Sequence, residues 1–156
     1  METFNEWLST VPEAITGDLL WKMKVYRLAL FLADLAWRDV SKLVTDRRTV
    51  SLADQLFRAV GSVGANIAEG YSRQSGKDRT RFYEYALGSA RESRHWYYQG
   101  RYVLSERVTE HRTQILAEIS RLLLTIIPQD RTYNLAEEQS SYEALHPDLL
   151  NAPPLP

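Results

Sequence analysis

The strongest constraint on the fold is an apolar seam within residues 51–70. Its members recur every four or three residues, so at about 100° per residue they fall on one narrow stripe of an α-helix. They are Leu52, Leu56, Val60, Val63 and Ile67. Ser51 precedes the seam as a predicted N-cap. Gly70 follows it, and we expect this glycine to end the helix in the left-handed C-cap conformation.

Two further segments carry similar seams. A first long helix is predicted from Asp18, a good N-cap, to about Asp46. Its apolar positions are Val25, Leu28, Leu32, Leu35 and Leu43. A last helix follows a turn near Ser105 and ends before Pro128, because proline cannot continue a helix. Its seam consists of Val108, Ile115, Ile119, Leu122 and Ile126.

A third helix, between these, is predicted to open at Lys77 or Asp78 after a turn over residues 70–76. Small residues alternate with large aromatics on its expected inner face, which suits close helix packing. That face consists of Phe82, Tyr85, Ala86, Ser89, Ser93, Trp96, Gly100 and Val103. Strand alternation and hairpin turn signals are absent from the sequence. We therefore predict an all-α protein, an antiparallel up-down-up-down four-helix bundle.

The chain divides into three predicted parts. Residues 1–17 form an N-terminal extension, in which helical spacing predicts a short amphipathic helix before Pro12. That helix would present Phe4, Trp7, Leu8 and Val11 on one face. Residues 18–128 form the bundle. Residues 129–156 form an acidic, Pro-rich tail, expected to be largely irregular with a short helix near residues 135–145.

Charge is distributed unevenly, although the net charge is −1. Residues 19–128 hold 18 basic and 11 acidic side chains, whereas residues 1–18 hold four acids and residues 129–156 hold five acids and one arginine. A basic body between acidic ends is compatible with a polyanionic partner. The sequence has no cysteine, which excludes disulfides and thiol catalysis and suits a reducing cytoplasm. It shows neither a signal peptide nor an apolar run long enough for a membrane span, so we expect no membrane association.

Eight residues are candidates for nucleic-acid binding. Four lie in the turn after Gly70 and in the following helix start, and four share the predicted outward face of the third helix. They are Arg73, Lys77, Arg79 and Arg81, then Arg91, Arg94, Tyr98 and Arg101. Arginines with an interleaved tyrosine suit phosphate contact and base stacking. The alternative is a solvated face laced with Glu84, Glu92 and Glu106.

A second, polar stripe lies beside the apolar seam of residues 51–70. It consists of Gln55, Arg58, Ser62, Asn66 and Glu69, which are neighbours at i, i+3 and i+4. We interpret it as a structural ladder that fixes this helix against the next helix or a neighbouring subunit. Arg58 is expected to pair with an acid such as Glu69 or Glu92.

Catalytic and metal-binding patterns are weak. Glu92 with His95, and Glu143 with His146, have the Glu-x-x-His spacing of di-iron bundles. Glu92 and His95 point away from the apolar face, however, and the second pair lies in the tail. His111 is a remote candidate for a general base. The sequence has no HExxH motif, phosphate-binding glycine loop or nucleophile elbow. We therefore predict no enzyme activity, no cofactor and no metal site, with a metal-binding bundle as the remote alternative.

One pattern carries a family resemblance. The segments "QLFRAVGSVGANIAEGYSRQS" at 55–75 and "FYEYALGSARES" at 82–93, with "VYRLALFLADLAW" in the first helix, resemble the four-helix bundle proteins encoded by intervening sequences of bacterial 23S ribosomal RNA genes. The similarity covers roughly residues 22–127. It implies an antiparallel four-helix bundle, often a ring-shaped homopentamer, that lacks known catalytic residues and associates with RNA or a ribonucleoprotein. A similar bundle is the accessory protein of diversity-generating retroelements.

A homo-oligomer is also expected from the residues themselves. The aromatics of the third helix cover more than one of its sides, so some should meet another subunit. They are Trp96, Tyr97, Tyr98 and Tyr102. The leading prediction is a non-enzymatic oligomeric bundle that binds RNA through a basic surface. The alternative is a protein–protein scaffold or accessory subunit without direct RNA binding.

Overall fold

The computed structural model describes residues 3–127 and 154–156. These residues are all-helical and contain no strand, which confirms that the protein is all-α over its described part. The elements are α1 (Phe4–Thr10), α2 (Glu13–Thr16), the short 3₁₀ helix η1 (Leu19–Lys22), α3 (Lys24–Leu43), α4 (Val50–Tyr71), α5 (Gly76–Leu104) and α6 (Glu106–Ile126). The predicted end at Pro128 and the predicted helix near residues 135–145 lie outside the described residues.

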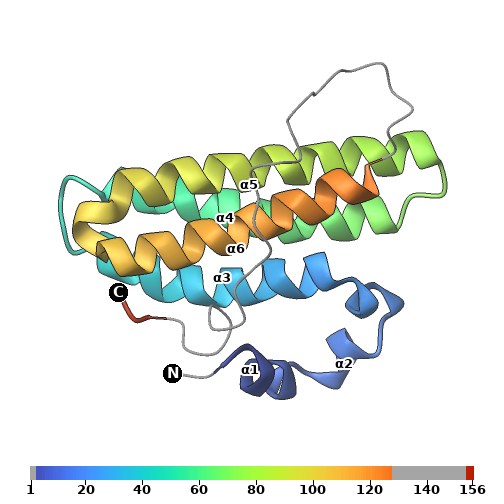
Figure 1. Cartoon of the computed structure of the whole chain (residues 1–156), viewed down its shortest axis with the longest axis horizontal. Coiled ribbons are helices and arrows are strands. Elements are labelled where there is room, and N and C mark those ends of the chain that lie inside the picture. Colours follow the sequence, from blue (N-terminus) through green and yellow to red (C-terminus); the bar gives the residue numbers. More distant parts are fainter. Residues whose placement is uncertain (1–2, 128–153) are drawn as a thin grey trace.

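Four long helices, α3 to α6, lie side by side and enclose the core (Figure 1). Each packs against the next along the chain, and α3 also contacts α6. The predicted seams of α3 and α4 are buried, with Leu52 half-buried at the margin. Near the end of α6 the buried stripe differs from the predicted seam. Leu123 is fully buried, whereas Leu122 is half-buried and Ile126 is exposed.

Helix starts differ from the predicted caps. Asp18 does cap a helix, since its Oδ1 accepts a 2.8 Å hydrogen bond from Leu20 N, but that helix is η1 and α3 begins later, at Lys24. Helix α4 begins at Val50, so Ser51 is already inside it. Before α4, the buried Thr49 hydroxyl donates to the Leu43 carbonyl at 2.6 Å. This hydroxyl stabilises the turn between α3 and α4 instead of capping α4.

The predicted role of Gly70 is wrong. Helix α4 continues through Tyr71, and no glycine in the described part of the chain has a positive φ. Glycine is required there for space: a Cβ atom on residue 70 would lie 2.8 Å from Cε1 of Tyr83 and 3.1 Å from Cβ of Phe82. Helix α5 can therefore cross the end of α4 at close range. It begins at Gly76, with the Ser75 hydroxyl accepting from Asp78 N.

The buried face of α5 is shifted by one residue from the prediction. Ala86, Ser93 and Gly100 are buried as expected, but the large residues between them come from the other side of this small-residue stripe. The buried residues are Thr80, Tyr83, Ala86, Leu87, Ala90, Ser93, Tyr97, Gly100 and Leu104. Of the residues expected on this face, Phe82, Ser89, Trp96 and Val103 are half-buried and Tyr85 is exposed. The helix faces its neighbours with tyrosines whose hydroxyls can find partners.

The N-terminal residues pack against the bundle. The predicted short helix is confirmed as α1, and Phe4 and Trp7 are buried against Phe31 of α3, with ring centroids 5.1 and 5.3 Å from it. Trp7 Nε1 donates a 2.6 Å hydrogen bond to Asp34 Oδ2. Helix α1 therefore covers part of α3. Across the described residues, no helix combines the length and the apolar character that crossing a bilayer requires.

Candidate nucleic-acid interface and a buried ion-pair cluster

The first group of predicted nucleic-acid residues lies where α4 ends and α5 begins. The Arg73 guanidinium lies 4.8 Å from the Phe82 ring centroid, and that of Arg81 lies 5.7 Å from the same ring. Arg81 also lies 6.0 Å from the ring of Tyr85, which is 51% exposed. Arg73 forms an i,i+4 ion pair with Glu69. A guanidinium is attracted to the face of the aromatic ring next to it. This first group is therefore a partly exposed arginine–aromatic patch whose arginines are held in place by the rings.

Lys77 and Arg79 complete this first group. Both are exposed on the first turns of α5, as predicted. Positive charge at a helix N-terminus is mildly unfavourable because of the helix dipole. Asp78 and the Ser75 cap offset part of that cost.

The second group extends from the middle of α5 toward its other end. Arg101 lies between two tyrosines, with its guanidinium 4.0 Å from the Tyr98 ring and 4.2 Å from the Tyr102 ring. It donates to the Tyr98 carbonyl at 2.8 Å and to the Tyr102 hydroxyl at 2.6 Å. Tyr98 is 57% exposed and Tyr102 is 84% exposed. Arg91 and Arg94 are half-buried on the same helix, less exposed than predicted.

The structure does not bring all eight residues into one patch. Arg81 and Arg101 are separated by about 30 Å along α5 at 1.5 Å per residue. The basic surface therefore has two arginine–aromatic groups toward opposite ends of α5, around Arg81 and Arg101, while Arg91 and Arg94 lie between them near the middle of the helix. Tyr102 belongs to the second group and was missed as a site residue, although its position next to Arg101 was visible in the sequence.

The predicted polar ladder connects α4 and α5 at one point. Asn66 Nδ2 donates to the carbonyl and hydroxyl oxygens of Ser62, both at 2.9 Å. Ser62 also bonds Ser89 of α5 at 3.1 Å. Arg58 pairs with Asp54 at 2.8 Å, not with either predicted acid, because Asp54 lies one turn earlier on the same face. Gln55 is half-buried beside this stripe.

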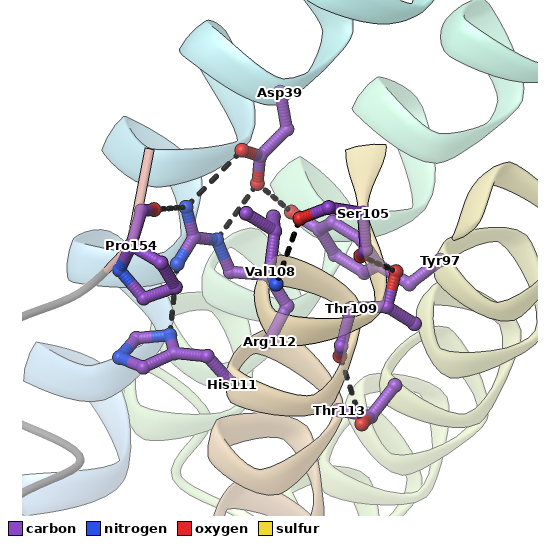
Figure 2. Close-up of polar contacts among 9 residues, drawn as sticks. All are labelled: Asp39, Tyr97, Ser105, Val108, Thr109, His111, Arg112, Thr113 and Pro154. Atoms are coloured by element: carbon purple, nitrogen blue, oxygen red, sulfur yellow. Dashed lines mark hydrogen bonds and ion pairs between the residues drawn. The ribbon is translucent and has the colours of Figure 1, made fainter. Parts of the chain in front are cut away.

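A buried charged cluster that the sequence analysis did not predict joins α3, α5 and α6 (Figure 2). Arg112 Nε lies 2.8 Å from Asp39 Oδ2, and Arg112 Nη2 lies 3.1 Å from Asp39 Oδ1. The Tyr97 hydroxyl donates to Asp39 Oδ2 at 2.9 Å. Burial and the adjacent Asp39 carboxylate together raise the pKa of the Tyr97 phenol well above 10, against the opposing effect of Arg112. Tyr97 therefore stays protonated and acts as a donor.

Two further groups accept hydrogen bonds from Arg112. Arg112 Nη1 lies 2.8 Å from Nδ1 of His111, which accepts because a guanidinium has only donors. Arg112 Nη2 also donates to the Pro154 carbonyl at 2.9 Å. His111 is therefore buried beside a permanent cation, and its Nδ1 is engaged by Arg112.

A signal for this cluster was present in the sequence. Asp39 lies between Leu35 and Leu43 on the apolar seam of α3, and Arg112 lies between Val108 and Ile115 on that of α6. Charged side chains at seam positions are buried, and buried charges are paired. Two opposite charges on the seams of different helices therefore indicate an ion pair in the core.

An apolar groove lies between α3 and α4. It has a volume of about 250 Å³ and is lined by Ala33, Asp34, Trp37, Phe57, Val60 and Gly61. Trp37 and Phe57 meet edge to face at 5.8 Å and remain 64% and 43% exposed. Exposed aromatic pairs of this kind are typical of protein interaction surfaces.

The described residues offer no group of three or more His, Cys, Asp or Glu side chains that could hold a metal ion. Glu92 accepts a hydrogen bond from Trp96 Nε1 at 3.2 Å, and the His95 ring packs edge to face on Trp96. Glu143 and His146 lie outside the described residues.

Comparison with known proteins decides the family. A family model described as 23S rRNA-intervening sequence protein matches residues 21–125. The chain belongs to this family. A solved structure of an S23 ribosomal protein family member from Bacteroides thetaiotaomicron, itself a protein of unknown function, is similar to this chain with 27% sequence identity and a TM-score of 0.62. The similarity covers 66% of this chain and 97% of that one. No curated protein matches this chain.

The family match contains both arginine–aromatic groups and the Asp39–Arg112 cluster, while α1 and Pro154 lie outside it. The intervening-sequence domain is therefore supplemented here by segments at both ends that contact it.

Proposed function

We propose that this intervening-sequence protein is a non-enzymatic module that associates with RNA, alone or in a ribonucleoprotein, through the basic surface of α5. The observation that carries the proposal is the pairing of exposed tyrosines with ordered arginines. Arg101 lies between Tyr98 and Tyr102, and their exposed faces can stack on unpaired bases while the arginine contacts phosphate. Recognition of this kind has little sequence readout and depends strongly on salt.

Several structural expectations accompany this proposal. The short connections between α3, α4, α5 and α6 favour an antiparallel up-down-up-down bundle, since a chain that turns within a few residues must reverse direction. Exposed aromatics on α3, α4 and α5 support a homo-oligomer, with a pentamer as the favoured size, and light scattering on the full chain tests it. The absence of cysteine supports a cytoplasmic location. Elemental analysis after purification tests the absence of a bound metal.

The decisive test is fluorescence anisotropy of labelled single-stranded RNA at low and at moderate salt. We expect binding that weakens steeply as salt rises, with a slope of about −0.7 per neutralised phosphate on a log–log plot. Replacing Arg91, Arg94 and Arg101 together with Glu should abolish binding without unfolding the protein.

The matched control makes the same charge change on another face. Arg38, Lys42 and Arg47 are exposed on α3 and the turn after it, so their triple Glu variant has the same net charge. It should retain most of the RNA affinity if the α5 surface binds. Equal loss in both triple variants would indicate only a long-range charge effect, and no binding at low salt would overturn the proposal.

A second candidate function is a protein–protein scaffold or accessory subunit that does not bind RNA directly. The groove beside Trp37 and Phe57 favours it, because an exposed aromatic pair is suited to burying a partner's apolar side chains. This function predicts that Trp37→Ala abolishes capture of a protein partner and that RNA shows no salt-dependent binding.

A further inference from the structure

The Arg112 guanidinium is a fixed donor before any ligand reaches it. Asp39 accepts from both Nε and Nη2, so the planar group is held in one orientation from α3, and His111 accepts from Nη1. One remaining Nη2 donor direction is used by the Pro154 carbonyl at 2.9 Å (Figure 2). The Arg112 side chain is only 1% exposed with Pro154 in place. A preorganised donor of this kind lowers the entropic cost of binding its acceptor.

The contact does not follow from chain proximity. Arg112 lies near the start of α6, and Ile126, the last residue of that helix, lies about 21 Å further along at 1.5 Å per residue. Nevertheless Pro154 returns to the α6 start, where Figure 1 places the red C-terminal segment near the adjoining ends of α3 and α6. The chain thus brings its C-terminal segment back to the Asp39–Arg112 end of the helices.

The segment that reaches Arg112 suits a carbonyl-recognising site. Proline has no backbone N–H, so the carbonyl is the one backbone hydrogen-bonding group that Pro154 offers. Leu155 precedes Pro156, which restricts Leu155 to extended conformations. Pro154 and Pro156 are half-buried, whereas Leu155 is 61% exposed. Recognition therefore uses the carbonyl and the proline rings and not the leucine side chain.

The charge of the site favours a neutral acceptor. Asp39 already neutralises Arg112 through two hydrogen bonds. A phosphate or carboxylate ligand would bring an uncompensated negative charge close to the buried Asp39 carboxylate, which is unfavourable in a low-dielectric interior. A peptide carbonyl meets the same donor without that cost.

We propose that Arg112, oriented by Asp39 and His111, is a docking site for an extended, proline-containing peptide segment, and that the chain's own C-terminus is its resident occupant. Among the described residues, one hydrogen bond and two half-buried prolines hold the occupant, and the proposal requires that it exchange with free solution. Short proline-containing segments are preformed in the extended conformation and bind at low ordering cost.

The test measures, by NMR, hydrogen exchange of the Arg112 Nη2–H that donates to the Pro154 carbonyl. In the full chain this proton should be protected. A variant ending at Leu150 should exchange it about tenfold or more faster, as expected for loss of a local cover, with an unchanged melting temperature. An excess of the free hexapeptide of residues 151–156 should then restore protection. A peptide whose amide between Pro154 and Leu155 is replaced by an ester, a weaker acceptor, should restore less.

Two full-length variants keep the test independent of truncation. Replacing Pro154 and Pro156 together with Gly should also speed the exchange, because glycine does not restrict the backbone to extended conformations. Leu155→Ala is the matched control and should leave exchange unchanged. Three results would overturn the proposal: unchanged exchange after truncation, failure of the free peptide to restore protection, or equal restoration by inorganic phosphate.

Discussion

Asp39 on α3 and Arg112 on α6 form a two-hydrogen-bond ion pair whose side chains are 0% and 1% exposed. The pair joins two helices that are far apart in sequence, and Tyr97 of α5 adds a third hydrogen bond to the same carboxylate. Three of the four long helices thus meet at one carboxyl group. Buried charges tolerate only a few arrangements of their partners, so this cluster restricts how α3, α5 and α6 can pack.

Removing one member of the pair should be costly. Asp39→Asn leaves a buried guanidinium without its counter-charge, and we expect the free energy of unfolding to fall by about 3–5 kcal/mol. The double variant Asp39→Leu, Arg112→Met should lie closer to the wild type than Asp39→Asn does, because it leaves no charge uncompensated. Urea unfolding of the variants measures both effects. A loss below about 1 kcal/mol for Asp39→Asn would contradict the burial of the pair.

Tyr97→Phe isolates the third hydrogen bond. The ring stays, but the Asp39 carboxylate loses a donor, so we expect a loss of about 1.5–3 kcal/mol, typical of hydrogen bonds to charged groups. Tyr98→Phe is the matched control on the next residue. Its ring is 57% exposed, and its removal of a hydroxyl should change stability by less than about 0.5 kcal/mol. Equal effects in the two variants would argue against the hydrogen bond between Tyr97 and Asp39.

Glu118 should make stability depend on pH. Burial alone would raise the pKa of its carboxyl, but hydrogen bonds from Arg121 and Lys24 outweigh burial and lower the pKa below its ordinary value of 4.5. The unfolded state therefore binds the proton more tightly than the folded state. The stabilisation from Glu118 is fully present above about pH 4.5 and is lost as the pH falls through the lower folded pKa.

The Glu118→Gln variant measures that contribution. We expect its urea midpoint to vary less with pH than that of the wild type between neutral pH and the acid transition. Asp46 contributes its own dependence of stability on pH in both proteins, since hydrogen bonds from Arg48 lower its pKa to about 2. The difference between the two proteins therefore isolates Glu118, and parallel curves would refute its role.

Periodicity predicted the long helices because their apolar seams are strong. It did not predict the rotation of α5. The small residues Ala86, Ser93 and Gly100 recur every seven residues, so they lie on one stripe of α5. Large aromatic residues flank this stripe on both sides, so the sequence of α5 is compatible with burial of either side. Tyr97 is buried because Asp39 on another helix accepts its hydroxyl, and such a partner is a tertiary property that a single-helix pattern does not contain.

The candidate site also combines features that the sequence reveals with features that depend on tertiary structure. Arginines and tyrosines on α5 were recognised from residue type and spacing, while their separation into two groups depends on the length of the helix. Asp39 and Arg112 stood at seam positions, so their burial could have been inferred. The contact between Arg112 and Pro154 could not, since it depends on where the chain returns after α6.

Gly70→Ala tests the close approach of α4 and α5. The new methyl group would lie 2.8 Å from Cε1 of Tyr83, whose ring is buried and has little room to move, so we expect a loss of about 1–3 kcal/mol. Gly61→Ala is the matched control in the same helix. Nothing lies within 4 Å of its Cβ position, and the better helix propensity should stabilise the protein by up to about 1 kcal/mol. Thermal unfolding should show shifts of opposite sign, and a stabilising Gly70→Ala would refute the steric argument.

Ser105 joins α5 to α6 in a conformation that side chains rarely adopt, with φ 89° and ψ 153°. Such a conformation costs about 1–3 kcal/mol for a residue other than glycine. Ser105→Gly would relieve it, at the expense of a 3.4 Å capping hydrogen bond from Val108 N and of greater freedom in the unfolded chain. We expect a net stabilisation of about 0.5–1 kcal/mol, measured by urea unfolding. Ser75→Gly is the control, because Ser75 makes the same kind of cap at φ −74°, where there is no strain to relieve. The Ser75→Gly variant should be less stable than the wild type. If Ser105→Gly also lowered the free energy of unfolding, Ser105 would not be strained.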